Sequence, residues 1–393
     1  MAVNAILRAK AEALIREQLI NTIQQDTPTS SIFMKLAKKL PNMTSNVTRM
    51  PVLDMLPLAY WVDGDTGMKG LTSQAWDNIY LNAEELAVIV PIPEAVIADA
   101  SFDIMGEVTP RLTEAIGASV DKAILFGIDR PANWPLDIVT RARIAGNNVS
   151  VTSNANYYDL LLGEGGVISK IEEDGYMSTG ALASMAMRGK LRGIKSTDGI
   201  PLFKSDMQGS TQYSLDGAPL YFPVNGSFDQ TQAQLIVGDF TKAVYAIRQD
   251  ITVKILDQGV IQDPTTKEIK YNLAQQDMLA IRVVFRMGWA LPNPATKLDG
   301  SRTGCPFAYL EPATAATKYT ANITVEDSSA SPITNASVEV GGAKVVTGSE
   351  GVAKFSLDKG TYTVKVKAEG YKAQTTEFEV SEATTDVTVT LKK

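Results

Sequence analysis

The chain has 393 residues, of which 45% are hydrophobic and 21% are charged, and its formal net charge is −7. This length allows two or three domains with a sizeable core, and no apolar run approaches the roughly 20 residues that a membrane span needs, so no membrane partner is expected. The sequence contains no histidine and a single cysteine, Cys305, which excludes histidine-dependent catalysis, the usual zinc sites and an internal disulfide.

The first 50 residues are a basic arm ahead of an acidic body. They carry seven Lys/Arg against three Asp/Glu, and they lack a secretory pattern, so we expect the chain to stay in the cytoplasm in which it is made. Their pattern predicts an amphipathic helix over 1–25 and a short helix from Ile32 to Leu40. The arm as a whole has too few apolar residues to fold alone. We expect the arm to lie on a neighbouring subunit, although a solvated arm is the simpler alternative, and its candidate contacts are Lys35, Lys38 and Lys39.

A long β-hairpin is predicted next. Met50 to Val62 and Trp76 to Val90 have the composition of strands, and the segment between them is rich in turn formers. Lys69 at the tip could form an amide bond to an Asn side chain of a neighbouring subunit, although a solvated lysine is the simpler interpretation. The hairpin could pack on its own domain; otherwise another chain must cover its aromatic residues, which makes candidate inter-subunit contacts of Tyr60, Trp61, Trp76 and Tyr80.

A long helix is predicted to form the spine of the body. Pro93 suits the first position of a short helix that ends near Asp99. Gly127 can end the long helix that follows, and Pro110 is expected to kink it. Asp121 is expected to face water. The core face of this helix is an apolar ladder at a spacing of four residues, made of Val108, Leu112, Ile116, Val120 and Ile124.

The middle of the chain mixes helices and strands, which predicts an α+β fold. A loop is expected over 128–154 and a helix from Asn156, and a further helix capped by Ser178 or Thr179 is expected to contain Leu182. Strands are predicted over 217–223, 233–238, 243–248, 251–255 and 278–290. Pro312 to Thr317 is predicted to be a linker.

The last 75 residues, which suffice to fold independently with marginal stability, have a different composition. Strand signals recur roughly every ten residues, and from Thr361 to Glu369 apolar and polar residues alternate, which predicts a sheet with one wet face. The pattern predicts an immunoglobulin-like β-sandwich whose core includes Phe355, Leu357, Phe378, Val380, Val387, Val389 and Leu391. The segment from Gly360, GTYTVKVKAEGYK, resembles the carboxypeptidase regulatory-like domains.

No stretch carries a convincing catalytic, cofactor or metal pattern. The run from Asp63 to Gly67 lacks the later ligands of a calcium loop, and Gly163 to Gly166 lacks the Lys and Ser/Thr of a phosphate loop. Glu172 to Asp174 is typical of a solvated helix end. We therefore predict no cofactor, no metal and no enzymatic activity.

The order of these parts resembles the major capsid proteins of tailed bacteriophages, those with the Hong Kong 97-like fold, over roughly residues 30–300. The runs that carry the resemblance are SSIFMKLAKKLPNMTSNVTRMPVL, IPEAVIADASFDI, AILFG, YMSTGALASMAMRGKLRGIKSTDGIPLF, GDFTKAVYAIRQDITVKIL and MLAIRVVFRMGWAL. The resemblance implies an N-terminal arm (1–49), an extended hairpin loop (50–90), a peripheral domain with the spine helix (91–150 and 266–295), an axial domain (151–265), a return segment and linker (296–318), and the immunoglobulin-like domain (319–393).

By the same resemblance, the chain is expected to form pentamers and hexamers of a closed shell in the virion, around double-stranded DNA bound without sequence specificity. The chain has no fused scaffold of coiled-coil type, so a separate scaffolding protein and a portal are implied, with assembly in the host cytoplasm. The C-terminal domain is expected outside the shell, as a decoration or as an adhesin for surface glycans. The alternatives are an encapsulin-type shell around cargo enzymes and a histidine-free enzyme.

Overall fold

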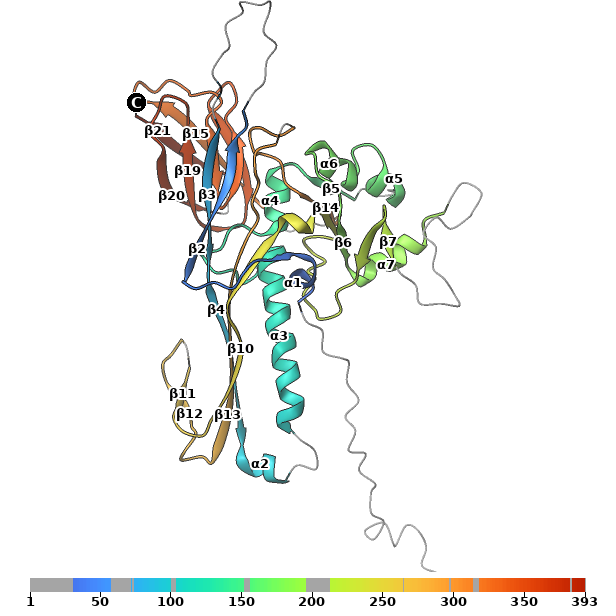
Figure 1. Ribbon diagram of the computed structural model, residues 1–393, viewed down its shortest axis with the longest axis vertical. Coiled ribbons are helices and arrows are strands. Elements are labelled where there is room, and N and C mark those ends of the chain that lie inside the picture. The colour runs from blue at the N-terminus through green and yellow to red at the C-terminus, as the bar shows by residue number, and fades with distance from the viewer. Residues whose placement is uncertain are drawn as a thin grey trace, which may run out of the picture.

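A long helix, α3 (Ile104–Phe126), lies along an elongated four-stranded sheet at the centre of the molecule (Figure 1). The structure is a computed structural model, and it describes residues 31–57, 72, 74–99, 104–151, 156–195, 213–263, 265–296, 298–313, 318–381 and 384–392. The predicted helix over 1–25, Tyr60, Trp61, Lys69 and the loop from Asp63 to Gly67 lie outside the described residues.

The predicted core face of α3 is confirmed. Leu112, Ile116, Val120 and Ile124 are buried in the main hydrophobic core, Val108 packs at its margin, and the helix continues through Pro110. The prediction for Asp121 is wrong, because this side chain is fully buried. It accepts hydrogen bonds from the start of a preceding helix, and these replace the water that a carboxylate would otherwise need.

The central sheet has the strand order β1-β10-β13-β4. Its strands are β1 (Lys38–Lys39), β10 (Val244–Leu256), β13 (Met278–Ala290) and β4 (Glu84–Pro93). β1 is parallel to β10, and the other two pairs are antiparallel. The predicted segments 243–248 and 251–255 form a single strand, β10, with two irregularities in its register against β13.

The first helix is shorter than predicted. α1 spans Ile32–Leu36, and the chain then becomes the edge strand β1. The helix ends early because Lys38 N and Leu40 N donate instead to the carbonyls of Ala243 and Tyr245, at 2.9 and 2.8 Å. Hydrogen bonding to the open edge of the sheet therefore replaces helical hydrogen bonding after Leu36.

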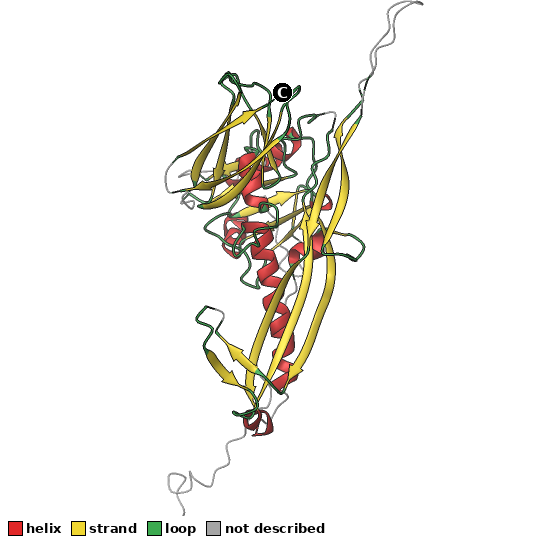
Figure 2. Ribbon diagram, turned by 90° about the vertical axis from the view of Figure 1, so that its left-hand side faces the viewer, coloured by secondary structure: helices red, strands yellow, loops and turns green. Residues whose placement is uncertain are grey.

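The predicted hairpin is divided between two sheets. β2 (Val47–Met55) pairs with β3 (Ala75–Asn82) as a two-stranded ribbon. The predicted return strand over 76–90 is wrong, because strand structure is interrupted at Ala83. The residues after it form β4, which pairs with β13 in the central sheet instead of with β2. Figure 2 shows the ribbon rising above the central sheet as a separate, narrow element.

A second sheet carries the upper body, in the order β5-β14-β9-β6-β8-β7. The predicted loop 128–154 in fact contains α4 and β5, and Leu182 lies on β6, so that the following helix, α7, begins later and is capped by Ser184. The remaining elements of the body are α2 (Glu94–Asp99), α4 (Ile138–Ile144), β5 (Asn148–Ser150), α5 (Tyr157–Leu162), α6 (Val167–Glu173), β6 (Gly180–Ala183), α7 (Met185–Arg192), β7 (Ser214–Leu215), β8 (Ala218–Tyr221), β9 (Leu235–Gly238), η3 (Phe240–Lys242), β11 (Val260–Gln262), β12 (Ile269–Asn272) and β14 (Phe307–Glu311).

The C-terminal region is a separate all-β sandwich, as predicted, and its predicted core residues lie in or against one hydrophobic cluster. Its two sheets have the orders β18-β15-β21 and β17-β16-β19-β20. The strands are β15 (Tyr319–Asp327), β16 (Ser337–Val340), β17 (Ala343–Val346), β18 (Val352–Leu357), β19 (Gly360–Lys367), β20 (Gln374–Val380) and β21 (Thr385–Leu391). The predicted α+β body followed by a β-sandwich is confirmed.

One side chain of the body completes the core of this sandwich. Leu136 is 2% exposed and belongs to the C-terminal cluster, although it precedes α4 in the sequence. Its backbone N donates to the carbonyl of Gly341 at 2.8 Å. The C-terminal domain is therefore docked onto the body.

Among the described helices, none is both long and apolar enough to cross a membrane.

Candidate inter-subunit surfaces

The three lysines predicted as contacts lie on one exposed stretch at the edge of the central sheet. Lys35 is on α1, and its Nζ lies 5.3 Å from the ring centre of Tyr221. Lys38 and Lys39 form β1 and are exposed, while their backbones pair with β10. The backbone is therefore held in register while the charged ends of all three side chains reach the solvent.

Trp76 and Tyr80 are both on the outer face of the β2–β3 ribbon, as their spacing of four residues in a strand requires. They are 65% and 54% exposed, respectively. Across the ribbon, Leu53 pairs with Trp76 and Arg49 with Tyr80. This outer face, which we call the ribbon face, consists of Val47, Arg49, Pro51, Leu53, Trp76, Asn78 and Tyr80.

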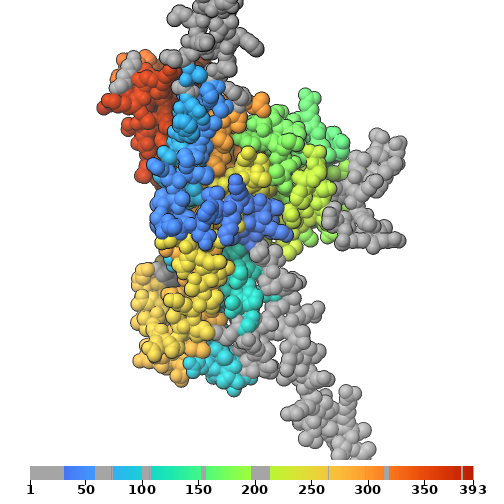
Figure 3. Space-filling model, viewed as in Figure 1, coloured from blue at the N-terminus to red at the C-terminus, as the bar shows by residue number. Residues whose placement is uncertain are grey.

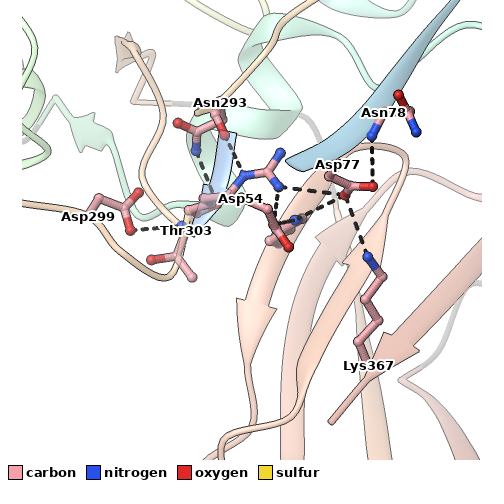
Figure 4. Close-up of polar contacts among 9 residues, drawn as sticks. Asp54, Asp77, Asn78, Asn293, Asp299, Thr303 and Lys367 are labelled. Carbon is pink, nitrogen blue, oxygen red and sulfur yellow. Dashed lines mark hydrogen bonds and ion pairs between the residues drawn. The ribbon is translucent and has the colours of Figure 1, made fainter. Parts of the chain in front are cut away.

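The inner side of the same ribbon carries a charged site that the sequence analysis missed. Asp77 lies on the same side of β3 as the apolar Ile79 and Leu81, and this acid in an apolar register was the available signal. Arg302, whose side chain is 4% exposed, forms ion pairs with Asp54 of β2 and, at 3.6 Å, with Asp77. Its Nε donates to the carbonyl of Asn293 at 2.6 Å, so the body fixes the guanidinium in place (Figure 4).

Two lysines of the C-terminal domain approach the same carboxylates. Lys344 Nζ on β17 lies 3.8 Å from Asp54 and 4.0 Å from Asp77, and Lys367 Nζ on β19 lies 3.6 Å from Asp77. Burial would raise the pKa of Asp77, but the hydrogen bond from Asn78 N and the charges of Lys367 and Lys344 outweigh it and hold this pKa below its ordinary value.

The charged site lines a cavity of about 300 Å³ where the ribbon, the body and the C-terminal domain meet. Other parts of its wall come from Trp134, Arg141 and Gly342. No described serine, threonine, cysteine or histidine lines this cavity, and its carboxylate Asp77 is engaged in ion pairs with Arg302 and Lys344. Over the described ranges, no group of acidic or cysteine side chains has the geometry to hold a metal ion.

Comparison with protein families gives two matches that divide the chain where the fold divides. Residues 11–296 match the phage capsid family. Residues 320–392 match the carboxypeptidase regulatory-like domain. The first match covers the arm from residue 11, the ribbon and most of the body, and the second covers the β-sandwich.

Individual relatives agree with the first match. The chain is 26% identical over 287 residues to the major capsid protein of Staphylococcus phage 80alpha, covering 72% of this chain and 83% of the relative. A solved chain of Mycobacterium phage Cain is 32% identical, with a TM-score of 0.69, and the match covers 80% of this chain and all of that one. A chain of Microbacterium phage Oxtober96 is 31% identical, with a TM-score of 0.68 over 79% of this chain and all of that one.

Proposed function

The chain belongs to the phage capsid family, and from that premise we propose that this major capsid protein closes, as pentamers and hexamers, into an icosahedral head shell around double-stranded DNA. Capsid proteins of this family work as homo-oligomers within the virion. The family also argues for a structural role in place of catalysis, and the phage matches favour a virus over an encapsulin-type compartment.

The ribbon face is the observation that carries this proposal. A two-stranded ribbon has little stability of its own, and a solvent-facing pair of large aromatic side chains is a poor feature for an isolated monomer. Trp76 and Tyr80 are flanked by the apolar Pro51 and Leu53 and by the charged Arg49, a composition enriched at protein interfaces. The occupant that we propose is the neighbouring subunit of the same shell.

Further contacts are proposed on the same grounds. Tyr60, Trp61 and Lys69 belong to the same hairpin in sequence, and we propose that they extend its contact with the neighbour. Lys35, Lys38 and Lys39 would meet acidic surface of an adjacent subunit, since the chain carries a net charge of −7. The peripheral and axial division, 91–150 with 266–295 and 151–265, remains part of the proposal.

The remaining partners follow from the shell. A separate scaffolding protein and a portal would direct assembly in the host cytoplasm, before the DNA enters. The C-terminal domain would face outward and decorate the shell or bind surface glycans weakly in many copies. Its eight lysines against ten acidic residues give it no net attraction to phosphate, which favours the outside over the DNA-filled inside.

Electron microscopy of the expressed protein tests the proposal directly. Negatively stained lysate, from cells that also express the phage's own assembly genes, should contain closed angular particles whose main band is this chain. Sedimentation of the same lysate should place most of the chain in a particle fraction. A monodisperse small oligomer, with no particle-associated pool, would contradict the proposal.

A further inference from the structure

The C-terminal domain contacts two different parts of the capsid subunit at once. On one side, Leu136 of the body is buried in the core of the sandwich, and its neighbour Pro135 lines the cavity where the ribbon, the body and the C-terminal domain meet. On the other side, β17 and β19 present Lys344 and Lys367 to the carboxylates of the ribbon. Figure 3 shows the ribbon (blue) lying directly against the C-terminal domain (red) on this face of the molecule.

The ribbon is anchored differently at its two ends. Near the central sheet, its inner side packs into a small apolar cluster, in which Met50 and Ile79 lie against the buried Leu81. At the far end, the inner side presents Asp54 and Asp77 instead. Asp54 is the unpaired residue of a bulge between the pairs Leu53–Trp76 and Met55–Ala75, and a bulge is a common device for aiming one side chain.

Three cations form ion pairs with these two carboxylates, and they come from two parts of the chain. Arg302 belongs to the body, whereas Lys344 and Lys367 belong to the C-terminal domain. The side chains of Arg302 and Lys344 are only 4% and 10% exposed, so salt screens their attraction to the ribbon less than it would at an open surface. The ribbon's far end is therefore held by charge, from the body and from the sandwich together.

We propose that the C-terminal domain has a second role as a clamp in the same chain, which holds the far end of the β2–β3 ribbon through Lys344 and Lys367 and fixes the direction of that ribbon relative to the body. Leu136 supplies the fixed point on the body against which the clamp acts. The domain is then an assembly determinant as well as an outward-facing module.

The consequence for assembly rests on the proposed function. If the ribbon face binds the neighbouring subunit, its direction sets the angle and spacing of that contact. A ribbon that swings about its apolar anchor at Met50 and Ile79 would present the same residues in many orientations. Binding to the neighbour would then carry the entropic cost of restricting the ribbon to one orientation. A clamp lowers this cost because it restricts the ribbon before binding.

The test compares two double variants of the full-length chain. Lys344→Glu with Lys367→Glu places two negative charges against Asp54 and Asp77, while Lys354→Glu with Lys372→Glu changes the net charge equally at two exposed lysines of the same domain. Hydrogen exchange on the unassembled subunit should become at least about tenfold faster in β2 and β3 of the first variant, with β15 and β16 unchanged. The second variant should exchange like the wild type.

A milder variant keeps the test informative if charge reversal disturbs folding. Lys344→Met with Lys367→Met removes the attraction without adding repulsion, and it should accelerate exchange in the ribbon in the same direction by a smaller factor. Unchanged exchange in the ribbon of both lysine variants would overturn the clamp. So would equal acceleration throughout the C-terminal sheets, because the lysines would then stabilise the domain itself.

Particle counts separate this inference from the proposed function. With the clamp broken, the yield of closed particles should fall at least about tenfold, while the control variant assembles normally. Should the wild type form no particles but the exchange pattern appear as expected, the clamp stands and the proposed shell fails. Normal particle yield from the charge-reversed variant would overturn the assembly role of the clamp.

Discussion

The hydroxyl of Ser31 donates a hydrogen bond to Oδ1 of Asp121 at 2.5 Å, and both side chains are buried. The backbone N–H groups of Ile32 and Phe33 donate to the same carboxylate at 3.0 and 3.2 Å. Burial raises the pKa of Asp121, and these hydrogen bonds oppose that rise. One carboxylate of the spine helix therefore ties down the point at which the N-terminal arm joins the body.

Replacing Asp121 with Ala should loosen this connection. Four donors, the three above and Nδ2 of Asn225 at 3.4 Å, would lose their acceptor, and we expect a cost of about 2–3 kcal/mol in the free energy of unfolding, measured by chemical denaturation. Glu172→Ala on the exposed end of α6 is the control and should change stability by less than about 0.5 kcal/mol. Equal stability of the two variants would show that the carboxylate is dispensable.

Trp76→Ser together with Tyr80→Ser should abolish assembly and leave the subunit folded. Both side chains are exposed, so their loss should alter the free energy of unfolding by no more than about 0.5 kcal/mol. Particle yield by sedimentation should fall at least about tenfold, because aromatic anchors dominate such interfaces. Asn78→Ser, on the same face and between the two aromatic residues, is the matched control and should assemble normally. Wild-type yield from the double variant would place the contact elsewhere.

Leu136→Ala should destabilise the C-terminal domain, although residue 136 lies far from it in the sequence. The substitution leaves a cavity in the sandwich core and should cost about 2–5 kcal/mol. Hydrogen exchange should show the loss in the C-terminal sheets first. Leu298→Ala, at a leucine that is 78% exposed, should be neutral. An effect confined to α4 would contradict the shared core.

Gly341→Ala tests the same interface from the other side. Gly341 has a φ of +54°, and an added Cβ would lie 2.3 Å from Cγ of Leu136. Strain and overlap together should cost about 2 kcal/mol or more, seen as a lower Tm. At Gly348, in the same domain, an added Cβ meets nothing within 4 Å, so Gly348→Ala should leave the Tm within a few degrees of the wild type.

Asp77 should make stability depend on pH in a defined direction. Its folded-state pKa is held below the ordinary value, so its contribution is fully present above the unfolded pKa of about 3.9 and is lost as pH falls through the folded pKa. The wild type should therefore exceed Asp77→Asn in the free energy of unfolding by a constant amount at neutral pH. That difference should shrink below about pH 4. A difference independent of pH would assign the effect of Asp77 to packing.

The sequence predicted best where one face of an element carries a long, regular pattern. The ladder from Leu112 to Ile124 specifies α3, and the β-branched run of β13 was predicted at its observed bounds, 278–290. Short elements were predicted poorly, because a few apolar residues fit either a helix or a strand. Leu182 illustrates this, since it was assigned to a helix but lies on the buried strand β6.

The charged site could not be predicted from local pattern because its members are far apart in the chain. Asp77 was assigned to a strand, but nothing within the strand indicates Arg302 or Lys367 as partners. The same holds for Asp121, whose partner Ser31 is 90 residues away. Asp77 stands in an otherwise apolar register, which marks a buried partner without identifying it, whereas Asp121 was wrongly predicted to face water.

Leu136 also bears on how such subunits exchange modules during evolution. The C-terminal family match begins at residue 320, yet part of the core of that domain is encoded almost two hundred residues earlier. A recombination event that joins a foreign C-terminal segment at the linker would bring in a sandwich whose core is shaped for a different side chain at position 136. Successful exchange therefore requires matched change at Leu136 and Gly341, so inheritance of the two modules should be linked even though their folds are separate.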